Sequence, residues 1–68
     1  MKKIETIEEF DELIDDVYYS IKSVYINGKK IHKRKEYDGF DDMFDNGYTL
    51  NYYLENQNLY LVLNEKTL

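Results

Sequence analysis

Apolar residues recur at helical spacing near the beginning of the chain. Five of them stand three or four positions apart: Ile7, Phe10, Leu13, Ile14 and Val17. This spacing places them on one side of an α-helix. Thr6 is suited to cap the first turn, because Glu9 stands three residues later and completes the spacing of a capping box. The pattern predicts an amphipathic helix that begins after Thr6 and ends near Tyr19.

The dipeptide Asn27-Gly28 predicts a tight turn, because a type I′ turn needs positive φ at both of its central positions. Ile21 and Val24 also continue the helical spacing, which leaves a longer helix that runs to Tyr25 as the alternative. The hairpin is favoured, and it predicts strands over residues 21–26 and 29–37.

The second half of the chain changes period. Within residues 38–47 the apolar side chains fall at Phe40, Met43 and Phe44. Their spacing fits one or two helical turns closed by Gly47. Residues 48–55 and 59–64 instead alternate apolar with polar side chains. This alternation predicts a second hairpin around the turn residues 56–58.

Together these elements predict an α+β fold. An N-terminal amphipathic helix is expected to pack on a four-stranded antiparallel sheet made from two hairpins, with the short helix connecting them. The 68 residues contain no proline, repeat or low-complexity run, so we expect residues 1–68 to form a single small domain.

Composition indicates the cellular compartment of the protein. The chain has no cysteine, so it has neither a disulfide framework nor a thiolate metal site. No apolar run approaches the roughly 20 residues of a membrane span, and the start lacks a signal peptide's apolar stretch. The abundance of lysine, isoleucine, asparagine and tyrosine resembles AT-rich bacterial or phage coding. We therefore expect a cytoplasmic protein of a bacterial cell or a phage-infected host, with no membrane association.

Charge changes sign in blocks along the chain. Residues 5–16 hold seven carboxylates and no base, residues 22–35 hold six bases and no acid, and residues 36–45 are acidic again. Like charges repel one another, so each block costs stability unless a partner or a neighbouring block compensates it. The pattern therefore favours binding over catalysis.

Catalytic motifs are missing from the sequence. His32 is the only histidine, with no second histidine or cysteine for zinc and no context for a nucleophile triad. Apolar residues interrupt every EF-hand register in the acidic stretch 38–45, and there is no glycine-rich phosphate loop. The sequence predicts no enzyme activity, no metal and no cofactor.

The acidic helix has a charge density close to that of DNA. Seven carboxylates over residues 5–16 span about 17 Å, or roughly one charge per 2.4 Å, against about one per 1.7 Å for duplex DNA. In size and charge the chain is similar to small phage-encoded inhibitors of nucleic-acid enzymes, including some anti-CRISPR and anti-restriction proteins, although it shares no motif with them. A plain solvated helix face is the alternative interpretation.

The main hypothesis is a small acidic protein-binding module that presents a DNA-like surface to a nucleic-acid-handling protein. The expected partner therefore has a basic surface. The candidate contact residues in the first helix are Glu8, Glu9, Asp11, Glu12, Asp15 and Asp16. The second acidic block adds Asp38, Asp41, Asp42 and Asp45, with Phe40 and Phe44 as apolar anchors.

Eight tyrosines support a second hypothesis. Tyr53 and Tyr60 are expected on the sheet face opposite the leucines, where they form an exposed aromatic strip with Val62. Tyr48 and Tyr52 are expected in the core. The alternative function is thus a small regulatory subunit or antitoxin that binds a protein through its exposed tyrosines, with a homodimer as one option.

The basic hairpin supports a third hypothesis. Its basic residues are Lys29, Lys30, His32, Lys33, Arg34 and Lys35. With Tyr25 and Tyr37 nearby, this segment could hold a nucleic-acid backbone while the tyrosines stack on bases. The net charge of −5 opposes direct nucleic-acid binding, because the overall field repels polyanions. Alternatively, the lysines protect a sheet edge from aggregation.

Overall fold

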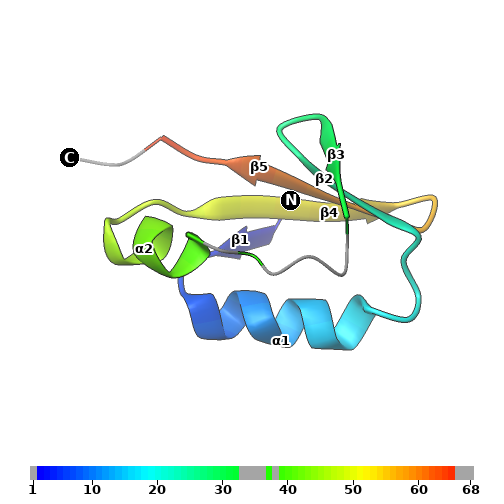
Figure 1. The fold of residues 1–68 in the computed structure, drawn as a ribbon, viewed down its shortest axis with the longest axis horizontal. Helices are drawn as coiled ribbons and strands as arrows, with labels where there is room; N and C mark the ends of the chain where they lie inside the picture. Colours follow the sequence, from blue (N-terminus) through cyan, green and yellow to red (C-terminus); the bar gives the residue numbers. More distant parts are fainter. Residues whose placement is uncertain (1, 33–36, 38, 66–68) are drawn as a thin grey trace.

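A computed structural model describes residues 2–32, 37 and 39–65. Its elements in chain order are β1 (Lys2–Ile4), α1 (Ile7–Val17), β2 (Ser23–Ile26), β3 (Lys29–Ile31), α2 (Phe40–Asp45), β4 (Leu50–Glu55) and β5 (Asn58–Leu63). The strands form one sheet in the order β1-β4-β5-β2-β3. Helix α1 runs along one face of this sheet, and α2 lies near the N-terminal end of α1 (Figure 1). The α+β class predicted from the sequence is confirmed.

Helix α1 begins as its sequence predicts. Thr6 has extended backbone angles (φ −133°, ψ 157°), and its Oγ1 accepts a hydrogen bond of 3.2 Å from the backbone N–H of Glu9. The helix ends at Val17, two residues before the predicted end. A turn follows, in which the backbone N–H groups of Ser20 and Ile21 both donate to the Val17 carbonyl, at 3.0 and 3.1 Å.

Two tight turns make the two hairpins. Asn27 (φ 48°) and Gly28 (φ 82°) connect β2 to β3, and Asn56 (φ 51°) and Gln57 (φ 65°) connect β4 to β5. Positive φ at both positions is what a type I′ turn requires, so the predicted Asn-Gly hairpin is confirmed. The second turn contains two residues rather than the predicted three, because Asn58 already pairs with Glu55 in the sheet.

The sheet corrects the predicted four antiparallel strands. It has five strands and is mixed, because β1 adds to β4 in antiparallel orientation and β2 pairs with β5 in parallel orientation. The parallel pair brings together Val24 and Leu59, both completely buried. A three-residue strand is too short to show a period, and a parallel pairing joins segments that are distant in sequence. Neither feature is visible in a local pattern.

The strands of the first hairpin are also shorter than predicted. Strand β2 begins at Ser23 rather than at residue 21, because the amide of Ile21 is already bonded in the turn that follows α1. Strand β3 ends at Ile31, and the predicted continuation to residue 37 fails at His32 and Tyr37, which lie outside any strand. Residues 33–36 of that prediction lie outside the described residues.

The core lies between α1 and the sheet. Its buried members are Ile4, Phe10, Val17, Ile21, Val24, Phe44, Leu50, Leu59 and Leu61. The described residues include no buried polar or charged side chain. Tyr52 packs against this core from β4, as predicted, whereas Tyr48 is half-buried outside it. Because apolar side chains of α1 and one sheet face meet here, the other sides of both layers lie outside the core.

Candidate protein-binding surfaces

The outward side of α1 is uniformly acidic. Six carboxylate residues on it are exposed: Glu8, Glu9, Asp11, Glu12, Asp15 and Asp16. At about 100° per residue they fall within an arc of roughly 160°, and the five apolar residues of the helix fall within roughly 120° on the opposite side. The two arcs do not overlap. The carboxylates therefore lie together on a single exposed side of the helix, which we call the acidic face.

The acidic face is not neutralised by other parts of the described protein. Within residues 2–32, 37 and 39–65, none of its carboxylates makes an ion pair with a base, although Glu9 accepts a 3.2 Å hydrogen bond from Thr6 Oγ1. The described lysines of the basic hairpin, Lys29 and Lys30, lie on β3 at the far edge of the sheet from β1. Lys33, Arg34 and Lys35 lie outside the described residues.

The helix dipole adds to the cost of this arrangement. Glu8 and Glu9 are in the first turn, where the positive end of the dipole favours carboxylates. Asp15 and Asp16 stand in the last three residues of the helix, where the negative end of the dipole disfavours them, and the last turn has no basic residue. Folding alone therefore gives no reason for Asp15 and Asp16 to be acidic.

The second acidic block lies beside the first. Helix α2 packs against α1 through Phe40, whose ring centroid is 4.9 Å from that of Phe10. Its carboxylates Asp41, Asp42 and Asp45 are all exposed. Asp38, the remaining candidate of this block, lies outside the described residues. The two acidic segments therefore lie on neighbouring helices, α1 and α2.

The two phenylalanines of α2 are used inside the protein. Phe44 is only 8% exposed and belongs to the core, which corrects the expectation that its ring anchors a partner. Phe40 is half-buried and packs edge-on against Phe10, and its centroid is 5.6 Å from that of Tyr37. A six-residue helix is too short to be stable alone, so burial of both rings is what holds α2 in place.

The face of the sheet opposite α1 has a stack of three tyrosines. Tyr53, Tyr60 and Tyr25 are direct neighbours on β4, β5 and β2. The ring centroids of Tyr53 and Tyr60 are 4.7 Å apart, those of Tyr60 and Tyr25 are 5.0 Å apart, and the interplanar angle of each pair is 13°. The spacing of the rings therefore follows the spacing of the strands. The predicted position of Tyr53 and Tyr60 opposite the leucines is correct, and the contribution of Tyr25 was not foreseen. Val62 and Tyr53 are each 37% exposed here.

The central tyrosine of the stack makes its ring contacts and a hydrogen bond within the protein. Both faces of the Tyr60 ring are covered by neighbours, and Asn58 Nδ2 donates a 3.2 Å hydrogen bond to the Tyr60 hydroxyl. Base stacking would need uncovered ring faces. Tyr37, the other tyrosine proposed for it, packs edge-on against Phe10 at 4.9 Å, in the helix layer. Tyr25 and Tyr37 therefore do not share one surface.

Burial also affects the chemistry of Tyr37. Loss of solvent raises the pKa of its hydroxyl above the ordinary value of 10.0, and the nearby Tyr18 raises that pKa further. The neutral phenol is therefore favoured in the folded protein.

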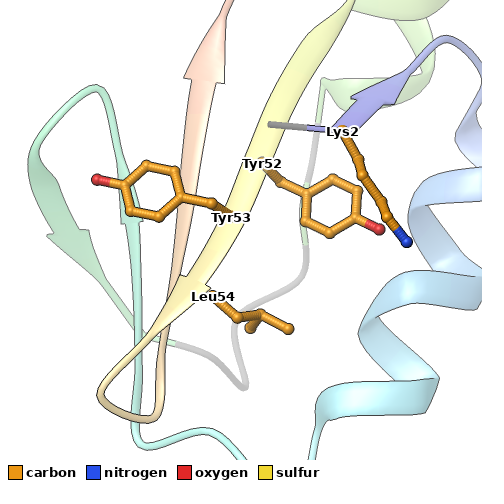
Figure 2. A pocket seen from close by; sticks show the side chains of 4 residues that line it. All are labelled: Lys2, Tyr52, Tyr53 and Leu54. Atoms are coloured by element: carbon orange, nitrogen blue, oxygen red, sulfur yellow. The ribbon is translucent and has the colours of Figure 1, made fainter.

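A cavity of about 320 Å³ opens beside Lys2 at the start of β1, where β4 continues past β1 to Tyr53 and Leu54 (Figure 2). It is lined by Lys2, Tyr52, Tyr53 and Leu54, and Leu54 is 50% exposed. The Tyr53 ring points away from the side toward which Tyr52 and Leu54 point (Figure 2). The lining supplies one ammonium and phenol groups but no carboxylate or imidazole, so it has no pair of the kind that activates a nucleophile.

Tyr19 is a surface residue that the sequence patterns did not single out. Its side chain is 94% exposed, and its ring centroid lies 5.1 Å from that of Tyr18, edge-on. A helical projection extended beyond Val17 would have placed Tyr19 on the polar side, which is the signal that could have found it.

Within residues 2–32, 37 and 39–65, no group of three or more histidine, cysteine, aspartate or glutamate residues is arranged to hold a metal ion. Neither of the two described helices has the length and apolar character needed to cross a membrane.

The chain matches no protein-family model, no curated protein and no solved structure. The acidic face and the tyrosine stack are the two most distinctive surfaces of the described residues.

Proposed function

We propose that this protein is a small acidic protein-binding module that inhibits a nucleic-acid-handling protein. The acidic face would bind the arginines and lysines that otherwise contact phosphates. The observation that carries this proposal is a row of six exposed carboxylates on one side of α1, with no ion pair among the described residues. From Glu8 to Asp16 the row is about 12 Å long. Its six charges over this length give a charge density comparable to that of duplex DNA.

Electrostatics would give such an inhibitor its speed. Clustered charge of one sign raises association rates with an oppositely charged surface by about 10- to 1000-fold at low ionic strength. The attraction acts over roughly 8 Å in physiological salt, so the partner's basic residues must come close to α1. Asp41, Asp42 and Asp45 of the neighbouring α2 extend the negative surface. No catalytic step and no cofactor enter this mechanism, which operates in the cytoplasm of a bacterial or phage-infected cell.

Anti-restriction and anti-CRISPR proteins are the kind of inhibitor that this proposal names. The support is the small size, the net charge of −5 and the grouping of acids on one helix. The position of Asp15 and Asp16 adds to it, because they weaken the end of α1 and so point to a role outside folding.

The test combines capture with kinetics. The protein is used to capture partners from a lysate of the bacterial host, the captured proteins are identified by mass, and association rates are measured at two salt concentrations. A variant with Glu12→Gln and Asp15→Asn is compared with one carrying Glu55→Gln and Glu65→Gln, which changes the net charge equally but away from α1. We expect the first pair to lower the low-salt association rate about tenfold and the second pair to change it less than twofold.

Two results would contradict the proposal. One is an association rate that stays the same when Glu12→Gln and Asp15→Asn are introduced. The other is a captured partner with no basic surface.

The tyrosine stack supports a second candidate function. Val62 and Tyr53 expose apolar surface on a sheet face that no described element covers. A regulatory subunit or antitoxin would bind its protein partner, or a second copy of itself, through this face. Sedimentation separates the two functions, because a monomer at micromolar concentration favours the acidic inhibitor, whereas a dimer that is lost on Tyr53→Ala favours the sheet face.

A further inference from the structure

Tyr19 presents an aromatic ring almost entirely to solvent. It is 94% exposed, whereas Leu54, the next most exposed large hydrophobic side chain among the described residues, is 50% exposed. Its ring packs edge-on against Tyr18, with an interplanar angle of 86°. The contact with Tyr18 leaves nearly all of the Tyr19 side chain accessible to a partner.

Tyr19 stands at helical spacing from two residues of the acidic face. The hydrogen bonds from Ser20 and Ile21 to the Val17 carbonyl continue the helical winding for one turn beyond the helix. Tyr19 follows Asp15 by four positions and Asp16 by three, and residues at these spacings are neighbours on a helix surface. Asp15 and Asp16 are both exposed.

We infer that Tyr19, Asp15 and Asp16 form a binding site for an arginine side chain of the partner. The guanidinium would stack on the Tyr19 ring and pair with a carboxylate at the same time. This inference rests on the proposed function and adds a preference for arginine over lysine. It also supplies an apolar anchor, whereas Phe44 is buried and Phe40 is packed against Phe10.

The chemistry of the two bases explains this preference. Arginine is planar and weakly hydrated, so it can lie flat on an aromatic ring while its edge donates two hydrogen bonds to a carboxylate. The lysine ammonium is compact and strongly hydrated, so an exposed carboxylate attracts it but an exposed ring adds little. An acidic face without an aromatic ring would therefore discriminate much less between the two.

The experiment uses the whole protein and two simple probes. A hexa-arginine peptide and a hexa-lysine peptide are titrated at low salt, and binding is followed by NMR signals of isotope-labelled tyrosine rings. We expect the arginine peptide to bind about two- to fivefold more tightly than the lysine peptide and to shift the Tyr19 signals. Tyr19→Ala should abolish this preference, Tyr19→Phe should keep it, and Tyr53→Ala on the opposite sheet face should leave it unchanged.

The outcomes separate this inference from the proposed function. If both peptides bind equally and Tyr19→Ala changes nothing, the arginine site is wrong while the acidic face stands. If neither peptide binds the unmodified protein, the proposed function and the arginine site both fail. Circular dichroism of each variant establishes that the fold is retained, and a loss of preference in Tyr19→Phe as well would overturn the stacking geometry.

Discussion

The acidic face of α1 and the tyrosine stack on the sheet lie on opposite sides of the molecule and differ in how their groups are satisfied. Each tyrosine of the stack contacts another at 4.7 to 5.0 Å, so the stack contributes to folding. The carboxylates of α1 have no ion pair among the described residues, and they repel one another. An unusual number of one residue type can therefore serve folding or serve binding. The contacts that the side chains make inside the protein distinguish the two cases.

Phe10→Ala should have the largest effect, because Phe10 packs both in the core and against α2. Phe10 is fully buried, and loss of its ring should cost about 3–5 kcal/mol. A domain of this size has a total stability of about the same magnitude, so we expect it to be largely unfolded at 25 °C. Circular dichroism and urea titration measure this. Tyr19→Ala is the matched control, and it should change the stability by less than about 0.5 kcal/mol.

Substitutions in the tyrosine stack should show that its central ring matters most. Tyr60→Leu removes two stacked pairs and should cost about 1–2 kcal/mol, and Tyr53→Leu removes one pair and should cost about half as much. Urea titration of both variants checks the ratio. Equal costs would mean that the rings contribute through burial alone.

Thr6→Ala should weaken the start of α1 by about 1 kcal/mol, because the Glu9 N–H loses its capping acceptor. Thr6→Ser retains the hydroxyl and should lose much less. Thermal unfolding of the two variants measures the difference. If alanine and serine behaved alike, the cap would not contribute to stability.

Tyr37→Phe should reduce the loss of stability that the protein shows as the pH becomes alkaline. The folded protein raises the pKa of Tyr37 above its ordinary value of 10.0, so it favours the protonated phenol. The resulting stabilisation is complete below pH 10 and is lost as the pH rises through the folded-state pKa. Urea titrations between pH 8 and 11 should show the unmodified protein losing more stability than Tyr37→Phe, with Tyr19→Phe as the control. Parallel pH curves would contradict the assignment.

Local patterns predicted the elements that local interactions build. The apolar stripe and cap of α1, the Asn27-Gly28 turn and the period-two strands of the last hairpin each depend on residues close in sequence. The parallel pairing of β2 with β5 depends on contacts between distant segments such as Val24 with Leu59, so no local pattern could show it. Strand β1 is held by Ile4, a single buried side chain in a three-residue segment, and therefore gave no periodic signal.

The candidate site was predicted unevenly for a related reason. Charge on a helix can be placed by periodicity, so the exposed carboxylates of α1 were correctly located. Burial of an apolar residue depends on which element packs over it, so Phe44 was misplaced on the surface. Tyr19 was missed for another reason, because the apolar stripe ends at Val17, and only a helical projection extended beyond that residue places Tyr19 on the polar side.

The most direct test of an uncompensated acidic face measures unfolding in urea at low salt and at about 0.5 M sodium chloride, which screens exposed charges. The unmodified protein is compared with a variant carrying Glu8→Gln, Glu12→Gln, Asp15→Asn and Asp16→Asn. We predict that salt stabilises the unmodified protein, and that the variant is about 1 kcal/mol more stable at low salt and responds weakly to salt, because several like-charge pairs at helical spacing are removed. If the stability of the unmodified protein did not change with salt, or if the variant were less stable than the unmodified protein at low salt, these carboxylates would be compensated within the fold.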